Sequence, residues 1–136
     1  MVGLMIIVDS NIFIFAENGN AEEHELAIKK IKLALNEGTF GINLVVASET
    51  FHILGRLLGV KEAAARTANI VGNPLAEWLD FSDNDFVEAV ALSEKMQIRI
   101  NDALIAQQAL VLGAQVLTDN VKHFKKIKGL KILPLR

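Results

Sequence analysis

Cysteine is absent from the 136-residue sequence. Its absence excludes disulfide bonds, a thiolate nucleophile and zinc sites built from cysteine ligands. Histidine is also scarce: His24, His52 and His123 are widely separated and form no HxH or HxxxH pair. A zinc site with histidine ligands is therefore not expected.

Long hydrophobic runs are missing as well, although 51% of the residues are hydrophobic. Charged or amide residues interrupt every apolar stretch before it reaches the ~20 residues that a membrane-spanning helix needs. The N-terminus also lacks a basic segment followed by a longer apolar core and a small-residue cleavage site. We therefore expect a soluble, cytoplasmic protein with no membrane association and with some apolar surface left for an oligomer or partner interface.

The net charge of −2 argues against broad nucleic-acid binding through the whole surface. The charge is nevertheless uneven, because residues 122–136 contain five lysines and one arginine but no acid. Two interpretations stand about equal: a solvated tail that keeps an edge strand soluble, or a contact with a polyanion. The basic residues are Lys122, Lys125, Lys126, Lys128, Lys131 and Arg136.

Strand and helix patterns alternate along the chain, with no repeat, low-complexity tract or linker between them. We therefore expect a single domain over residues 1–136. Apolar and β-branched runs predict strands at 4–8, 39–43, 77–82, 114–120 and 131–135. Helical spacing predicts helices at 20–38, 48–59, 61–73, 82–96 and 101–113, with Asn20, Ser48 and Asn101 among the candidate N-caps.

This alternation predicts an α/β fold, with a central, mostly parallel sheet of about five strands flanked by helices. The last strand is expected at an edge of the sheet, because Pro134 has no N–H to donate to a neighbouring strand.

Small polar residues crowd the ends of two of these strands. The apolar run at 5–8 stops at Asp9, Ser10 and Asn11, although a helix needs only one N-cap. The run at 115–117 stops at a similar triplet: Thr118, Asp119 and Asn120.

Four acids are expected to converge on one edge of the sheet. Asp9 and Asp119 follow strands, and Glu49 and Asp102 lie in or near the first turns of helices. In parallel α/β sheets, ligands bind beyond the carboxyl ends of the strands, where helices also begin. Taken singly, each acid is explained as well or better by a cap, a helix-dipole contact or a turn. Their joint placement favours a site.

Converging carboxylates repel one another unless a cation lies among them, and no lysine or arginine is an immediate sequence neighbour of the four acids. At least one is therefore expected to have a raised pKa in the metal-free protein. Oxygen ligands of this kind suit Mg²⁺ or Mn²⁺. Such a site is typical of phosphodiester hydrolysis.

Two other classes also place aspartates at strand ends, and neither fits. A haloacid-dehalogenase-like phosphatase needs Asp-x-Asp at the first strand, whereas position 11 is Asn. A response-regulator receiver needs paired acids there, a phosphorylatable Asp in mid-chain and a later Lys, and none of these is correctly placed.

Nearly the whole chain resembles the PIN-domain family of metal-dependent ribonucleases, in particular the VapC-type toxins of prokaryotic toxin–antitoxin pairs. The resemblance is carried by VDSNIFIF near the N-terminus, ASETFHIL, NDALIAQQALVLGAQVLTDN and the KHF that follows. It implies a PIN-like three-layer sandwich and a Mg²⁺- or Mn²⁺-dependent endoribonuclease. It also implies a homodimer and a small antitoxin partner that blocks the acidic site.

The resemblance assigns Asp9, Glu49 and Asp102 as metal-binding catalytic carboxylates. Polar support comes from Ser10, Asn11 and Thr118. The chain departs from the family at the fourth position. An acid often lies two residues after the threonine in the family, but that position is Asn120 here, and Asp119 precedes it. Both remain candidates for that place.

The basic segment adds a hypothesis about RNA binding, with Lys122, Lys125 and Lys126 as contacts to the RNA backbone. The alternative function is a PIN-like RNA-binding or assembly module with little or no catalysis. The uncharged Asn120 leaves that alternative open, whereas three clustered carboxylates argue against it.

Overall fold

The computed structural model describes residues 5–36 and 38–136, so residue 4 of the first predicted strand lies outside the described part. The described residues form one five-stranded sheet in the order β3-β2-β1-β4-β5. Every neighbouring pair is parallel, and β5 lies at an edge, as the position of Pro134 predicts. The strands are β1 (Ile6–Val8), β2 (Phe40–Ile42), β3 (Ala76–Trp78), β4 (Gln115–Thr118) and β5 (Lys131–Pro134).

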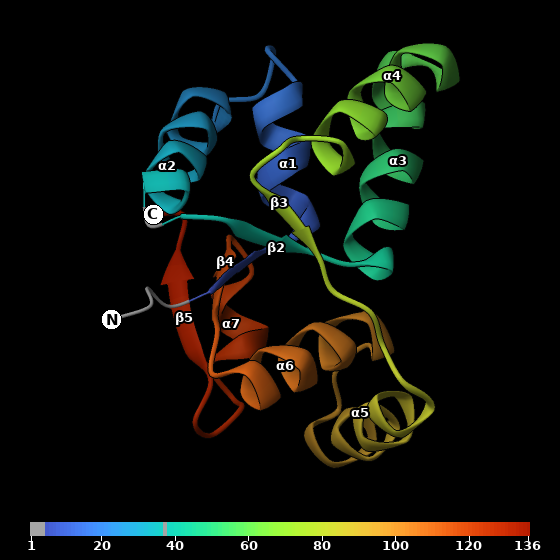
Figure 1. Cartoon of the computed structure of the whole chain (residues 1–136), viewed down its shortest axis with the longest axis vertical. Helices are drawn as coiled ribbons and strands as arrows, with labels where there is room; N and C mark the ends of the chain where they lie inside the picture. Colours follow the sequence, from blue (N-terminus) through green and yellow to red (C-terminus); the bar gives the residue numbers. More distant parts are fainter. Residues whose placement is uncertain (1–4, 37) are drawn as a thin grey trace.

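Helices cover both faces of the sheet and complete the predicted three-layer sandwich (Figure 1). One layer contains α1 (Ser10–Glu17), α2 (His24–Asn36), α3 (Leu44–Leu58) and α4 (Val60–Val71). The other contains α5 (Asp83–Met96), α6 (Ile100–Leu112) and the short α7 (Val121–Phe124).

Three predicted helix starts are wrong. Helix α3 begins directly after β2, because the side-chain oxygen of Asn43 accepts a hydrogen bond from the Val46 N–H at 2.9 Å. Ser48 therefore lies inside the helix. Asn101 also lies inside a helix, because α6 begins at Ile100. Helix α2 begins at His24, four residues after the predicted cap.

Helices α1 and α7 occupy segments in which the periodicity predicts no helix. Both are short and directly follow strands β1 and β4. Asp9 is the N-cap of α1. The two short helices thus start beside each other in space, because β1 and β4 are adjacent strands.

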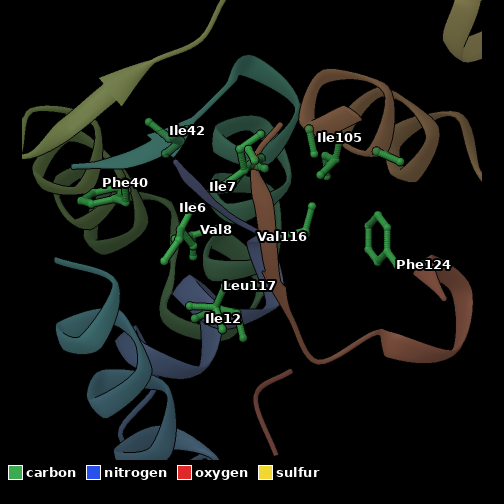
Figure 2. Packing of buried hydrophobic residues seen from close by; sticks show 14 of the residues in the cluster. Ile6, Ile7, Val8, Ile12, Phe40, Ile42, Ile105, Val116, Leu117 and Phe124 are labelled. Atoms are coloured by element: carbon green, nitrogen blue, oxygen red, sulfur yellow. The ribbon is translucent and has the colours of Figure 1, made fainter. Parts of the chain in front are cut away.

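The core is built on the two central strands. The side chains of Ile7, Val8, Val116 and Leu117 are fully buried, and Figure 2 shows them between the helical layers. Burial on both faces explains why these strands are continuous apolar runs rather than alternating patterns. Gly41 of β2 allows close packing here, since a Cβ at this position would lie 2.7 Å from Leu79 Cδ1.

The strand order fixes where a ligand site lies. From β1 the chain proceeds to β2 and β3 on one side of the sheet, and β4 and β5 lie on the other side. The connections after β1 and β4 therefore diverge, which opens a crevice at the carboxyl ends of these strands.

Within residues 5–36 and 38–136, no helix combines the length and the apolar character needed to cross a membrane.

Candidate active site

Asp9 lies at this crevice. Its backbone N–H donates to the Leu117 carbonyl at 2.9 Å, which continues the β1–β4 pairing by one residue. Its side chain is only 3% exposed. One carboxylate oxygen accepts from the Ser10 N–H at 2.8 Å, and the other accepts from the Thr118 hydroxyl at 2.7 Å. The carboxylate is therefore held in one orientation.

Asn11 and Thr118 connect the two polar triplets. The Asn11 side-chain amide donates to the second Asp9 oxygen at 3.2 Å, and its carbonyl oxygen accepts from the Asp119 N–H at 3.1 Å. The Thr118 hydroxyl also accepts from the Asn120 N–H at 2.9 Å. Two of the polar residues that follow these strands, Asn11 and Thr118, therefore hold the two loops against each other around the Asp9 carboxylate.

Glu49 and Asp102 reach the same place from two helices. One Glu49 oxygen accepts from the Ser10 hydroxyl at 3.4 Å, so α3 delivers this acid to the start of α1. Asp102 lies in the first turn of α6 and is almost completely buried. The structure thus brings together the three acids that the sequence analysis assigns as metal-binding, Asp9, Glu49 and Asp102, which we call the acid cluster.

The neighbouring acids contribute to a shift in the pKa of Asp9. This pKa is raised from 3.8 to about 6, first by burial and then by the negative charges of Asp102 and Glu49, against hydrogen bonds from Thr118 and Ser10 that lower it. One carboxyl pKa is thus raised, as expected, but the charges of the other two acids are among the smaller causes. The larger cause is removal of the carboxylate from water.

A cation does lie within the acid cluster. The Arg99 guanidinium contacts Glu49 Oε2 at 3.4 Å and Asp102 Oδ1 at 3.3 Å. Arg99 is three residues from Asp102 in sequence, so the absence of an immediate basic neighbour does not exclude a cation from the cluster.

As the structure stands, no three histidine, aspartate or glutamate side chains in its described part are grouped closely enough to hold a metal ion.

Asp119 faces away from the acid cluster. The Arg136 guanidinium makes two contacts with its carboxylate, at 2.9 and 3.1 Å, and also contacts Glu23 at 3.1 Å. We call Asp119, Glu23 and Arg136 the outer cluster. The adjacent residue has the opposite orientation, because the Asn120 side-chain amide lies 3.0 Å from His123 Nδ1.

His123 connects Asn120 to the acid cluster. Its Nδ1 atom lies 3.8 Å from Asp102 Oδ2. Asn120 is therefore linked to Asp102 through this histidine, whereas the Asp119 carboxylate contacts Arg136. Neither His123 nor Arg99 is among the site residues predicted from the sequence. Both had a signal in it: His123 belongs to the KHF motif, and Arg99 precedes Asp102 by three residues, nearly one helical turn.

The three predicted RNA-contacting lysines lie on and after α7, close in sequence to Asn120. Lys122, Lys125 and Lys126 are all exposed, and buried Phe124 anchors the helix between them. Among the described residues, none of the three lysines forms an ion pair with an acid. Their ammonium groups are therefore not held by an acid in this part of the chain.

The fold and the acid cluster define an α/β protein with an acidic site at the switch point of a parallel sheet. Residues 6–130 match the family model described as PIN domain, and the chain belongs to the PIN-domain family. A search of curated protein sequences finds no match.

Solved structures share the fold at low sequence identity. VapBC2 from Rickettsia felis, bound to a promoter DNA fragment, has a TM-score of 0.77 at 21% identity, covering 96% of this chain and 98% of that one. A toxin–antitoxin complex from Klebsiella pneumoniae has a TM-score of 0.72 at 18% identity, covering 96% and 98%. VapC20 from Mycobacterium tuberculosis, a toxin that cleaves the sarcin–ricin loop, has a TM-score of 0.74 at 17% identity, covering 86% and 92%.

Proposed function

We propose that this protein is a Mg²⁺- or Mn²⁺-dependent endoribonuclease that hydrolyses RNA phosphodiester bonds. The observation that carries the proposal is the acid cluster, in which carboxylates from the N-cap of α1, from α3 and from α6 lie together at the switch point of the sheet. A protein that needed these acids only as helix caps or turn residues would have no reason to bring them together against their mutual repulsion.

The donor set fits a hard divalent cation. All three acids offer carboxylate oxygens, which Mg²⁺ and Mn²⁺ prefer, and one of them has a pKa raised to about 6 by burial next to the other two. Positive charge inside the cluster would relieve that penalty. When bound, a divalent cation supplies the charge and Lewis acidity that phosphodiester hydrolysis requires.

The surrounding residues orient the carboxylates for this role. Thr118 and Asn11 fix one face of the Asp9 carboxylate, and the Ser10 hydroxyl contacts Glu49. His123 lies beside Asp102, and Asn120 contacts His123, so we place these two polar side chains at the fourth position. We assign the three acids and Asn120 to the active site and regard Asp119 as lying outside it.

We further propose that the protein is the toxin component of a toxin–antitoxin pair, with a homodimer as its own assembly. Support comes from the fold, which it shares with VapBC2 and with a toxin–antitoxin complex. Helix α3 also exposes Phe51 and Leu57, whereas Leu54 of the same helix is buried in the core. The exposed pair is apolar surface of the kind that a partner covers.

One observation favours the alternative, an RNA-binding or assembly module without catalysis. Arg99 already neutralises part of the negative charge of Glu49 and Asp102, so the site holds together without a metal. In that case RNA would bind but would not be cut.

Cleavage of labelled RNA separates the two functions. We expect cleavage with Mn²⁺ or Mg²⁺, none with EDTA, and a loss of at least about 100-fold in Asp9→Asn, since a lost charged ligand removes several kcal/mol of transition-state stabilisation. The matched control is Asp80→Asn. Asp80 follows β3 at the same edge of the sheet and is exposed, and its carboxylate accepts a hydrogen bond only from the Trp78 indole N–H within the described residues. RNA binding without metal-stimulated cleavage would favour the alternative.

A further inference from the structure

Arg99 occupies an unusual place in the acid cluster. It is the N-cap residue of α6, yet its side chain makes no capping hydrogen bond there. Ser, Thr, Asp and Asn are the residues that stabilise this position, so Arg99 contributes little to starting the helix. Its guanidinium instead joins two acids from different helices, while 64% of its side chain remains exposed.

The contacts of Arg99 are loose in comparison with those of two other arginines. Arg66 and Arg136 each join two carboxylates as well, and their shortest contacts are both 2.9 Å. The contacts of Arg99 lie between 3.3 and 3.5 Å, beyond the usual range of about 2.7–2.9 Å for charge-assisted hydrogen bonds. A side chain held in this way is easily displaced into solvent.

The same contacts use the oxygens that a cation would need. Arg99 contacts Glu49 Oε2 and both oxygens of Asp102. A divalent cation at these oxygens would stand within a few ångströms of the guanidinium, and the two positive charges would repel each other. The guanidinium and the divalent cation therefore compete for the same carboxylates.

We propose that Arg99 is a built-in competitor of the divalent cation: it offsets part of the negative charge of Glu49 and Asp102 in the metal-free protein and is displaced when the metal binds. This inference rests on the proposed metal-dependent function. Its consequence is a threshold, because the site fills only at metal concentrations high enough to displace the arginine. Arg99 therefore holds the Glu49 and Asp102 carboxylates in the metal-free site and is not itself a metal ligand.

Calorimetric titration with Mn²⁺ of protein freed of metal by EDTA and dialysed at low salt tests the inference directly. Arg99→Gln should bind Mn²⁺ at least about tenfold more tightly than the parent, which corresponds to 1.4 kcal/mol. Arg99→Lys keeps the charge and should remain near the parental affinity. The matched control is Arg66→Gln, because Arg66 joins Glu17 and Glu62 outside the acid cluster. Its affinity for Mn²⁺ should equal that of the parent.

Thermal unfolding provides a second readout, which does not depend on activity and is measured first in EDTA and then with saturating Mn²⁺ in place of EDTA. Arg99→Gln should melt below the parent, because its carboxylates repel without a counterion, and saturating Mn²⁺ should raise its melting temperature more than that of the parent. Equal or weaker Mn²⁺ binding by Arg99→Gln, with binding by the parent intact, would overturn this inference alone. Absence of Mn²⁺ binding in the parent and in every variant would overturn both the inference and the proposed metal dependence.

Discussion

The acid cluster and the outer cluster use the same chemistry at neighbouring strand ends, but with different charge balance and burial. In the acid cluster, Arg99 faces three carboxylates, of which Asp9 and Asp102 are almost fully buried. In the outer cluster, Arg136 faces two carboxylates, whose side chains are each 20% exposed.

The difference separates a site that needs another cation from one that does not. Arg136 makes two close contacts with Asp119, and solvent screens what charge remains. The acid cluster retains two uncompensated carboxylates in a place from which water is largely excluded. Among the described residues, no basic side chain lies within ion-pair distance of Asp9. Such an excess of buried negative charge is maintained at functional sites.

The largest expected difference is in the rate of RNA cleavage, when one acid of each cluster is neutralised in turn. Asp102→Asn should reduce metal-stimulated RNA cleavage by at least about 100-fold, because it removes a charged metal ligand. Asp119→Asn should leave the cleavage rate close to parental, because its carboxylate faces Arg136. Initial rates with Mn²⁺ measure both, with circular dichroism as the check on folding. Comparable losses in the two variants would erase the distinction between the clusters.

A second effect concerns the pH dependence of stability in the metal-free protein. The pKa of Asp9 is about 6 in the folded state and 3.8 ordinarily, so folding favours its protonated form. The associated stability is fully present below about pH 4 and is lost as the pH rises through 6. Relative to Asp9→Asn, the parent should therefore lose up to about 3 kcal/mol of unfolding free energy between pH 4 and pH 7.

Urea unfolding of the parent and Asp9→Asn at pH 4, 5, 6 and 7, with EDTA present, measures this difference. Asp119→Asn provides the comparison for the outer cluster under identical conditions. A parent-minus-variant difference for Asp9→Asn that stays constant from pH 4 to pH 7 would contradict the raised pKa of Asp9.

The smallest effect concerns the basic segment beside the outer cluster. Replacing Lys122, Lys125 and Lys126 with Gln should raise the KM for RNA and reduce the slope of log affinity against log salt by about 2, since each phosphate contact to a single strand contributes about 0.7. Filter binding of single-stranded RNA across a salt series measures the slope. If the slope does not change, these lysines belong to a solvated tail.

Much of the fold was predictable because its signals are local. Buried parallel strands are short apolar runs, and the intervening helices show their own periodicity, so the strand–helix alternation and the parallel sheet follow from the sequence. The short helices α1 and α7 were not predicted, since eight or four residues are too few for a periodic pattern. The start of α3 is displaced because the run at 39–43, which predicts a strand, includes Asn43, the N-cap of this helix.

The sequence by itself determined that Asp9, Glu49 and Asp102 would meet, because strand ends and helix starts share one edge in any parallel α/β sheet. Only the tertiary structure decided which of Asp119 and Asn120 faces the acids. The choice depends on Arg136 and Glu23, which lie far from Asp119 in sequence yet contact it or its arginine in space. The tertiary structure also decided that Arg99 stands between two acids, because that position requires α3 and α6 to lie side by side at their starts. Side-chain direction at a loop is set by its contacts, and contacts between distant segments leave no pattern in the local sequence.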